Sequence, residues 1–270
     1  MTISEKTELS EPLNRFGQTA TPAPPVVFLG RRTLQKLYLM LHLGRMLQST
    51  RSVRLDTVNP SVDKQTIYDY CGLEIHEYPD SESLRAELDT LGQNDTENHH
   101  RTLDADPVAR DNGLDPLETR SSIHMVDLPD LAVLPENSQC FLVTDSDRNS
   151  LDQAVASLQA SGSASSARFL VHRIYLDIWE GARIGVRYLE EMISRKFPEN
   201  AIAGEQLTLA ADERNWAAII DNQHDDRLRL SGLTTEYRRL LADVAAIGFR
   251  MPLKESGRQI RLADRRKKAC

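Results

Sequence analysis

Short apolar runs that alternate with longer amphipathic segments are the feature that most constrains this chain. Val26–Leu29, Ile123–Leu128 and Gln139–Thr144 are near-continuous apolar runs, and such runs are typical of parallel strands buried on both faces. Between the runs lie segments with apolar residues three and four positions apart, a spacing that predicts helices with one buried face. Strands that alternate with helices predict an α/β fold, a mostly parallel doubly wound sheet of about six to eight strands flanked by helices.

The same two patterns predict the remaining elements. Further strands are expected at Ser52–Asp56, Gly72–Tyr78, Arg168–Leu176 and Gln206–Leu209. Helices are expected at Leu34–Leu47, Leu84–Leu91, Ser150–Leu158, Glu180–Lys196, Asp212–Asp221 and Thr234–Ile247.

Composition divides the chain into three parts, and the second part contains an insertion. Residues 1–24 are polar and close on a proline-rich stretch, a composition that predicts a flexible N-terminal leader. Residues 25–250 form the predicted α/β domain, and the acidic, Asn- and Asp-rich stretch at about 79–120 predicts an insertion within it. Residues 251–270 are rich in Lys and Arg and predict a basic C-terminal tail.

Charge and residue usage exclude several classes of protein. The 33 Lys and Arg residues against 40 Asp and Glu residues give a net charge of −7, which disfavours a general nucleic-acid coat. The chain has neither an apolar run of about 18 residues, as a membrane-spanning helix needs, nor the pattern of a secretory signal at its N-terminus. The three cysteines are too widely spaced to indicate a disulfide framework or a metal site. We therefore expect a cytoplasmic protein without a bound metal.

The first strand leads into a glycine turn and a helix, where phosphate chemistry would be expected. In the phosphate-binding pattern G-x-x-x-x-G-K-S/T, glycines let backbone N–H groups surround the phosphates, the lysine neutralises their oxygens and the hydroxyl holds magnesium. Gly30 and Lys36 match this pattern, whereas Gln35 replaces the second glycine and Leu37 replaces the hydroxyl. The nucleotide site predicted here is therefore a degenerate one.

Strand ends further along the chain extend the pattern. Asp56 lies near the end of the next strand, and Asp127 precedes Leu128 and Pro129 at the end of an apolar strand. Together with the turn at Gly30, these residues resemble the landmarks of the deviant P-loop ATPases of the ParA and MinD family. The resemblance covers the order of elements from about residue 25 to 248.

The resemblance implies a P-loop NTPase-like fold and a role for each matching residue. Gly30 takes the place of the first glycine of the loop, and Arg31 that of the lysine that reaches across a nucleotide-sandwich dimer. Lys36 takes the place of the phosphate lysine, Asp56 that of the first acidic residue of the water-activating strand end, and Asp127 that of the Walker B aspartate.

Departures from the family pattern predict that this nucleotide site is a remnant. Leu37 cannot ligate magnesium, Val58 replaces the second acidic residue, and Val171-His172-Arg173 stands where the family offers an asparagine to adenine. Phosphoryl transfer depends almost wholly on positioning and charge neutralisation, so we expect no catalytic residue and no resident cofactor, although ATP and Mg²⁺ stay open as ligands. Structural roles also stay open: Lys36 as a surface helix residue, and Asp56 and Asp127 as caps of the loops that follow them.

The C-terminus predicts a second site. Between residues 254 and 268 there are seven basic and two acidic residues, which suits the anionic surface of a membrane or the phosphates of DNA; a solvated tail stays an alternative. The candidate residues for a partner or anionic surface are Arg258, Arg261, Arg265, Arg266, Lys267 and Lys268.

These patterns lead to one main hypothesis of function. The resemblance implies a ParA/MinD-like pseudo-ATPase that acts with a protein partner, and in some cases as a homodimer. Its role would be to position or assemble a bacterial cell-envelope machine such as a pilus or secretion system, or to serve a partition system, at the inner face of the membrane. The alternatives are an ATP-binding dimerisation switch with weak ATPase activity, and a non-specific DNA-binding partition accessory.

Overall fold

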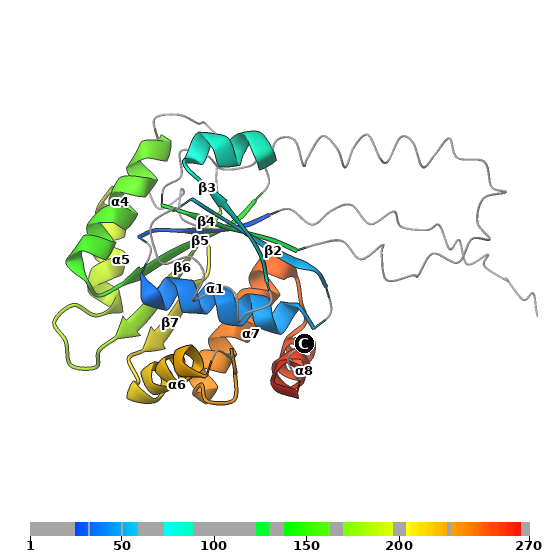
Figure 1. Ribbon diagram of the computed structural model, residues 1–270. Coiled ribbons are helices and arrows are strands. Elements are labelled where there is room, and N and C mark those ends of the chain that lie inside the picture. Colours follow the sequence, from blue (N-terminus) through cyan, green and yellow to red (C-terminus); the bar gives the residue numbers. More distant parts are fainter. Residues whose placement is uncertain are drawn as a thin grey trace, which may run out of the picture.

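Seven parallel strands form the central sheet of the protein (Figure 1). The computed structural model describes residues 25–31, 33–49, 51–58, 73–88, 123–129, 138–162, 170–196, 204–225 and 228–265. The strands lie in the order β3-β2-β4-β1-β5-β6-β7, and every neighbouring pair is parallel. Their bounds are β1 Val26–Leu29, β2 Val53–Val58, β3 Glu74–Tyr78, β4 Ile123–Leu128, β5 Gln139–Asp145, β6 Val171–Ile178 and β7 Gln206–Ala210.

Helices cover both faces of the sheet. One face is covered by α1, α6, α7 and α8, whose apolar side chains share a core cluster with Val26 and Phe28. The other face is covered by α4, α5 and a helix at residues 81–88, which share a cluster with Val27 and Leu29. Their bounds are α1 Leu34–Leu47, α4 Arg148–Gly162, α5 Val186–Lys196, α6 Glu213–His224, α7 Thr235–Phe249 and α8 Leu253–Arg265.

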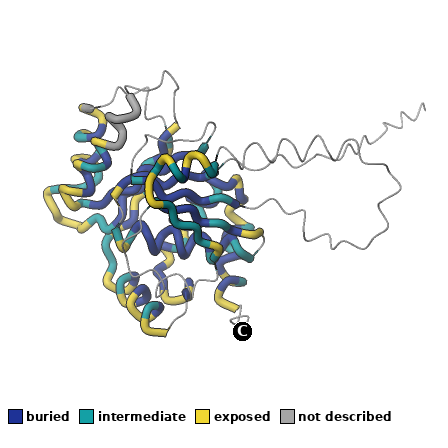
Figure 2. Tube along the Cα trace, turned by 45° about the horizontal axis from the view of Figure 1, so that its top comes forward, coloured by how far each residue is buried: buried dark blue, intermediate teal, exposed yellow. Residues whose placement is uncertain are grey.

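The central strand shows why the fold class could be predicted. All four residues of β1 are fully buried, because successive side chains point to opposite faces and both faces are covered. The central strands are mostly dark blue in Figure 2, whereas the edge strands β3 and β7 consist largely of intermediate and exposed residues. The predicted α/β class, a parallel doubly wound sheet flanked by helices, is confirmed.

Several predicted boundaries differ from the structure by a few residues, and two helices illustrate this. We predicted a helix from Glu180, but α5 begins only at Val186, because Gly181 adopts a positive φ of 82° and Ala182 donates to Trp179 O in a turn. The short helix expected at Leu84–Leu91 lies at residues 81–88. The rest of the predicted insertion, residues 89–120, and the predicted leader, residues 1–24, lie outside the described residues.

The C-terminal region is a further correction. We predicted a basic tail from residue 251, yet α8 is a helix of the folded body: Ile260 and Ala263 belong to the core cluster. Asp264 accepts hydrogen bonds from the backbone N–H groups of Leu230 and Ser231. Ile260 and Ala263 thus bury one side of a helix whose composition is otherwise mostly charged and polar.

In the part of the chain that the structure describes, no helix is both long and apolar enough to cross a membrane. The same part holds no cluster of His, Cys, Asp or Glu residues that could bind a metal ion.

Candidate functional site

The carboxyl edge of the sheet contains a topological switch point between the neighbouring strands β1 and β5. The helix that follows β1 packs on one face of the sheet, and the helix that follows β5 packs on the other. In open parallel sheets, ligands bind in the crevice that such a divergence creates at the carboxyl ends of the strands. Gly30, Arg31 and Lys36 follow β1 at this point, so they are considered first.

The turn from β1 to α1 requires a glycine. Gly30 has a φ of 109°, and a Cβ at this position would lie 2.4 Å from the carbonyl oxygen of Val143. Thr33 then caps the helix, because its hydroxyl accepts from the backbone N–H of Lys36 at 3.2 Å. Gln35 and Lys36 therefore lie in the first turn of α1, and the N–H group of Lys36 is already bonded within the chain.

Lys36 is buried and points into the protein. Its side chain is 2% exposed, and Nζ lies 2.6 Å from Asp127 Oδ1. Nζ also donates to the carbonyl oxygens of Gly30 at 2.8 Å and Leu128 at 3.2 Å. Because an ammonium group carries three hydrogens, these three acceptors match its whole donor capacity. The structure thus brings together the predicted residues Gly30, Lys36 and Asp127, in an internal ion pair.

Thr57 completes the pair, and the sequence pattern did not indicate it. Its hydroxyl donates to Asp127 Oδ2 at 3.0 Å, and the two residues are register partners on the neighbouring strands β2 and β4. Each oxygen of the Asp127 carboxylate therefore has a donor. A signal was available, since alternation along β2 places Thr57, not Asp56, on the face of α1.

Asp56 does not join this group. It lies within β2 with its side chain on the opposite face, where Arg54 Nε donates to Asp56 Oδ1 at 2.8 Å. Arg54 also contacts the Tyr78 hydroxyl at 2.7 Å and Glu87 of the helix at 81–88 at 3.3 Å. Asp56 is fully buried, Oδ2 has no hydrogen-bond partner, and burial raises the pKa of the carboxyl group above its ordinary value. The structure therefore separates Asp56 from Lys36 and Asp127 by the thickness of the sheet.

Arg31 lies at the switch point and connects the turn after β1 to the turn after β5. Its guanidinium contacts Asp147 at 3.1 Å, and both side chains are about half exposed. Asp147 also caps α4 by accepting from the N–H of Asn149, while Asp145 accepts from the N–H of Asp147 at 2.9 Å. The first turns of both helices at the switch point are therefore bonded by side chains of the chain itself.

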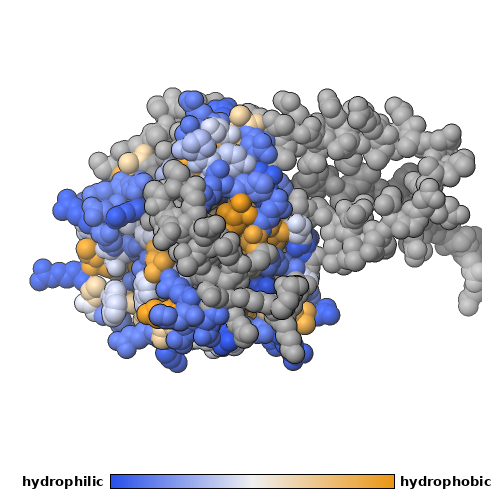
Figure 3. Space-filling view, viewed as in Figure 1, coloured by the Kyte–Doolittle hydropathy of each residue, from blue (hydrophilic) through white to orange (hydrophobic). Residues whose placement is uncertain are grey.

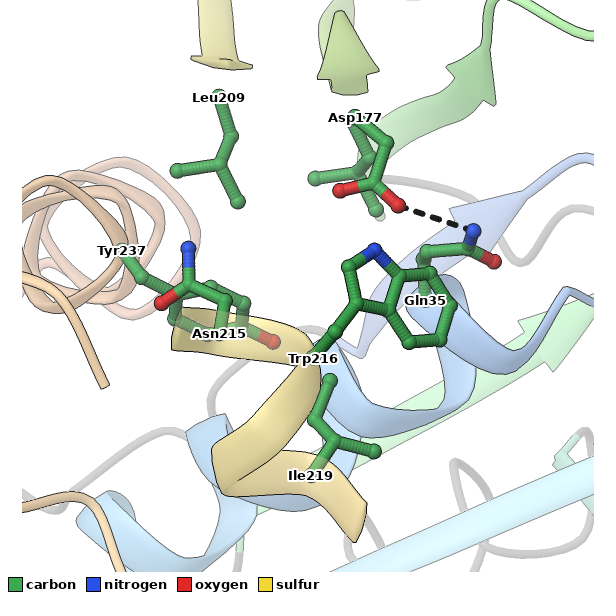
Figure 4. A pocket seen from close by; sticks show the side chains of 8 residues that line it. Gln35, Asp177, Leu209, Asn215, Trp216, Ile219 and Tyr237 are labelled. Atoms are coloured by element: carbon green, nitrogen blue, oxygen red, sulfur yellow. Dashed lines mark hydrogen bonds between the residues drawn. The ribbon is translucent and has the colours of Figure 1, made fainter. Parts of the chain in front are cut away.

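A small pocket lies between α1, β6, β7, α6 and α7 (Figure 4). Gln35 Nε2 donates to Asp177 Oδ2 at 3.0 Å. Burial raises the pKa of Asp177, whereas hydrogen bonds from Gln35 and Trp216 act in the opposite direction. The cavity volume is about 10 Å³, roughly the space that one water molecule needs.

The position of Asp177 corrects one inference from the sequence. We placed Val171-His172-Arg173 at the end of a strand where the family offers an asparagine to adenine. In the structure these residues are the first three of β6, at the amino ends of the strands and away from the switch point. The carboxyl end of β6 carries Asp177 instead, which already bonds Gln35.

The basic residues of α8 lie far from the crevice. Arg45, in the last turn of α1, contacts the carbonyl oxygen of Ala263, and Ser49, just after α1, contacts Gln259. The last turn of α1 lies about 15 Å along the helix from its first turn. Arg258, Arg261 and Arg265 are exposed. Arg266, Lys267 and Lys268 lie outside the described residues.

The geometry defines a doubly wound parallel α/β protein whose switch point is occupied by its own side chains. No protein-family model matches the chain, and no curated protein matches it.

Among solved structures, the chain is similar to a ParA family ATPase from Chlorobium tepidum TLS, with 11% identity, a TM-score of 0.48, and coverage of 82% of this chain and 98% of that one. It is also similar to the MinC:MinD cell division protein complex of Aquifex aeolicus, with 12% identity, a TM-score of 0.44, and coverage of 76% and 87%. The MinD cell division protein of Aquifex aeolicus gives 10% identity, a TM-score of 0.43, and coverage of 88% and 96%. At these identities the likeness concerns the fold alone.

Proposed function

We propose that this protein is a ParA/MinD-like pseudo-ATPase that works without nucleotide, through contact with a protein partner. In this proposal it positions or assembles a bacterial cell-envelope machine, such as a pilus or secretion system, or serves a partition system, from the cytoplasmic side of the membrane. The observation that carries the proposal is the state of Lys36. Its ammonium group is buried and its donors match three internal acceptors.

Energetics favour this closed arrangement over phosphate binding. To reach a phosphate, Lys36 would have to leave Asp127, which is 6% exposed. A buried carboxylate that loses its counter-charge costs about 3–5 kcal/mol. Leu37 offers no oxygen to magnesium, and the Gln35 side chain is held by Asp177. Binding would therefore have to offset this cost without a metal ligand from the turn.

Arg31 gives one observation in favour of the alternative, an ATP-binding dimerisation switch. Its ion pair with Asp147 is exposed, and exposed pairs contribute only about 0–1 kcal/mol. Arg31 could thus turn from Asp147 to a phosphate or to a second copy of the chain at little cost. The exposed arginines of α8 similarly favour the DNA-binding accessory, so both alternatives deserve a direct test.

A titration with a fluorescent ATP analogue, with and without Mg²⁺, separates these functions. We expect no saturable binding of millimolar nucleotide to the wild-type protein. We expect none either to a Lys36→Met, Asp127→Asn double variant, in which both members of the pair are replaced by neutral residues. Saturable, Mg²⁺-dependent binding that the double variant loses would instead establish the switch. Binding of a DNA duplex that weakens with salt and with Arg261→Glu would establish the DNA accessory.

A further inference from the structure

The segment from Trp179 to Tyr188, which runs from the end of β6 into the first turn of α5, exposes an unusual set of side chains. Trp179, in the turn after β6, is 57% exposed, and Tyr188, in the first turn of α5, is 43% exposed. Figure 1 shows this segment as the light green loop that projects at the left of the view, beyond the ends of the strands. In the space-filling view, hydrophobic residues at that edge lie among hydrophilic ones (Figure 3).

The backbone before Trp179 is strained, and the strain directs this segment outward. Asp177 adopts a φ of 51°, and the pairing of β6 with β7 shifts register between Tyr175 and Ile178. A left-handed conformation at a residue other than glycine costs about 1–3 kcal/mol and persists where its surroundings hold it. The hydrogen bond from Gln35 holds Asp177 in place (Figure 4). Irregularities of this kind re-aim the strand that carries them, and here they end β6 so that Trp179 leaves the core.

The charged groups next to Trp179 are mostly basic and unpaired. Arg183 and Arg187 are exposed, and neither forms an ion pair with any described residue. Glu191, one turn further along α5, is occupied by Arg195 at 2.6 Å. Glu180 is the one exposed acidic residue between Trp179 and Tyr188. The segment therefore presents two aromatic rings and two free guanidinium groups.

We propose that Trp179, Arg183, Arg187 and Tyr188 form a docking surface for a segment of a partner protein that carries acidic side chains around an apolar anchor. The inference rests on the proposed function, because a protein that acts by contact alone needs such a surface. Tryptophan, tyrosine and arginine are the residue types that most often carry the binding energy of interfaces. A guanidinium group binds a carboxylate through two parallel hydrogen bonds, and an indole ring accommodates an apolar side chain or a cation on its face.

The first experiment selects binders from a display library of random linear peptides on the full-length protein. We expect the enriched peptides to combine Asp or Glu with an aromatic or aliphatic residue. The most enriched peptide is then synthesised with a fluorophore and titrated against the wild-type protein and its variants. Trp179→Ala and Arg187→Glu should each weaken binding about tenfold or more. Arg187→Glu should not disturb the fold, since an acidic residue suits the first turn of a helix.

Two variants elsewhere serve as matched controls. Leu253→Ala removes an apolar side chain that is also 57% exposed, and Arg261→Glu reverses an exposed charge on α8. Both should bind the peptide as the wild type does. A second readout is the quenching of Trp179 fluorescence by acrylamide, identified by its loss in Trp179→Phe; bound peptide should protect this residue.

Three results would overturn the docking surface. They are a selection without acidic and apolar enrichment, peptide binding unchanged by Trp179→Ala and Arg187→Glu, and loss of binding only with Arg261→Glu, which would place the contact on α8. None of them bears on nucleotide binding. Failure of the docking surface is therefore distinct from failure of the pseudo-ATPase proposal, which the ATP analogue decides.

Discussion

Buried charges occur on both faces of the sheet, and they differ in how completely they are paired. The carboxylate of Asp127 has a donor at each oxygen, from Lys36 and Thr57. Asp56 has donors at Oδ1 only, and its Oδ2 is buried without a partner. We therefore expect substitutions in the Lys36 and Asp127 pair to change the stability of the fold strongly, whereas the contribution of Asp56 to stability should depend on pH.

Replacing Lys36 by methionine should lower the free energy of unfolding by about 3–5 kcal/mol, because Asp127 would stay buried without its counter-charge. The double variant Lys36→Met, Asp127→Asn should recover most of this loss, since no charge is then left unpaired. Urea unfolding measures both. Arg31→Met is the control for an exposed pair and should change stability by less than about 1 kcal/mol. Equal losses in the single and double variants would contradict the assignment of a coupled pair.

Asp56 should make stability depend on pH in a defined direction. Its pKa in the folded protein is raised above 3.8 by burial, against the opposing effect of Arg54. Between the two values the folded protein binds more protons than the unfolded chain, so this group stabilises the fold increasingly as pH falls through that window. At neutral pH, above both values, the raised pKa means that Asp56 lowers the free energy of unfolding.

The measurement is urea unfolding of wild type and Asp56→Asn from neutral pH down to about pH 4, near the ordinary value for an aspartate. The wild type should gain stability relative to the variant as pH falls. Taking the difference removes the similar contributions of Asp145 and Asp177, whose pKa values are also raised by burial. A difference that is constant across this range would show that Asp56 titrates as it does in the unfolded chain.

At the scale of the elements, α8 differs most from what its sequence indicates. Its composition is dominated by charge, yet Ser256, Gln259, Ile260 and Ala263 are buried against α1 and α7. Small and polar residues can fill such an interface when they find hydrogen-bond partners, as Gln259 does with Ser49.

Truncation before α8 and truncation after α8 should therefore have very different effects on the stability of the protein. Removing residues 251–270 should destabilise the protein by several kcal/mol, because it takes Ile260 and Ala263 out of the core and leaves the neighbouring surfaces bare. Removing only residues 266–270 should leave the melting temperature unchanged within about 2 °C. Differential scanning calorimetry measures both truncations. A stable protein that ends at residue 250 would restore the predicted basic tail.

The strands were the most predictable elements, and the physical reason is burial. Central strands such as β1 and β5 are covered on both faces, so their sequences show uninterrupted apolar runs. The candidate site was only partly predictable. Proximity of Gly30, Lys36 and Asp127 follows from strand ends meeting at one edge. Which way the Lys36 side chain points depends on the Asp127 carboxylate and the carbonyl oxygen of Leu128, which lie far away in the chain. The outward course of β6 at Asp177 also has no signal in the local sequence.

At the scale of the whole molecule, the switch point of the sheet is held by the chain's own groups. Arg31 pairs with Asp147 at the surface, and Lys36 pairs with Asp127 in the interior. The protein should therefore fold completely without a ligand.

Unmodified ATP with Mg²⁺ should accordingly leave the melting temperature unchanged. A ligand present at a hundredfold of its dissociation constant would stabilise the fold by about 2.7 kcal/mol, which a domain of this size would show as a rise of several degrees. Thermal unfolding at millimolar ATP, with and without Mg²⁺, measures this. A rise that requires Mg²⁺ would contradict the pseudo-ATPase proposal.

The ion pair at the base of the switch point also has an evolutionary consequence. Because Lys36, Asp127 and Thr57 satisfy one another, a substitution at one position relaxes or imposes selection on the other two. In chains that descend from a common ancestor with this protein, the three positions should covary, whether or not nucleotide is bound. A lysine that is conserved after a glycine turn would then reflect selection for a stable interior, and would not identify an ATP-binding protein.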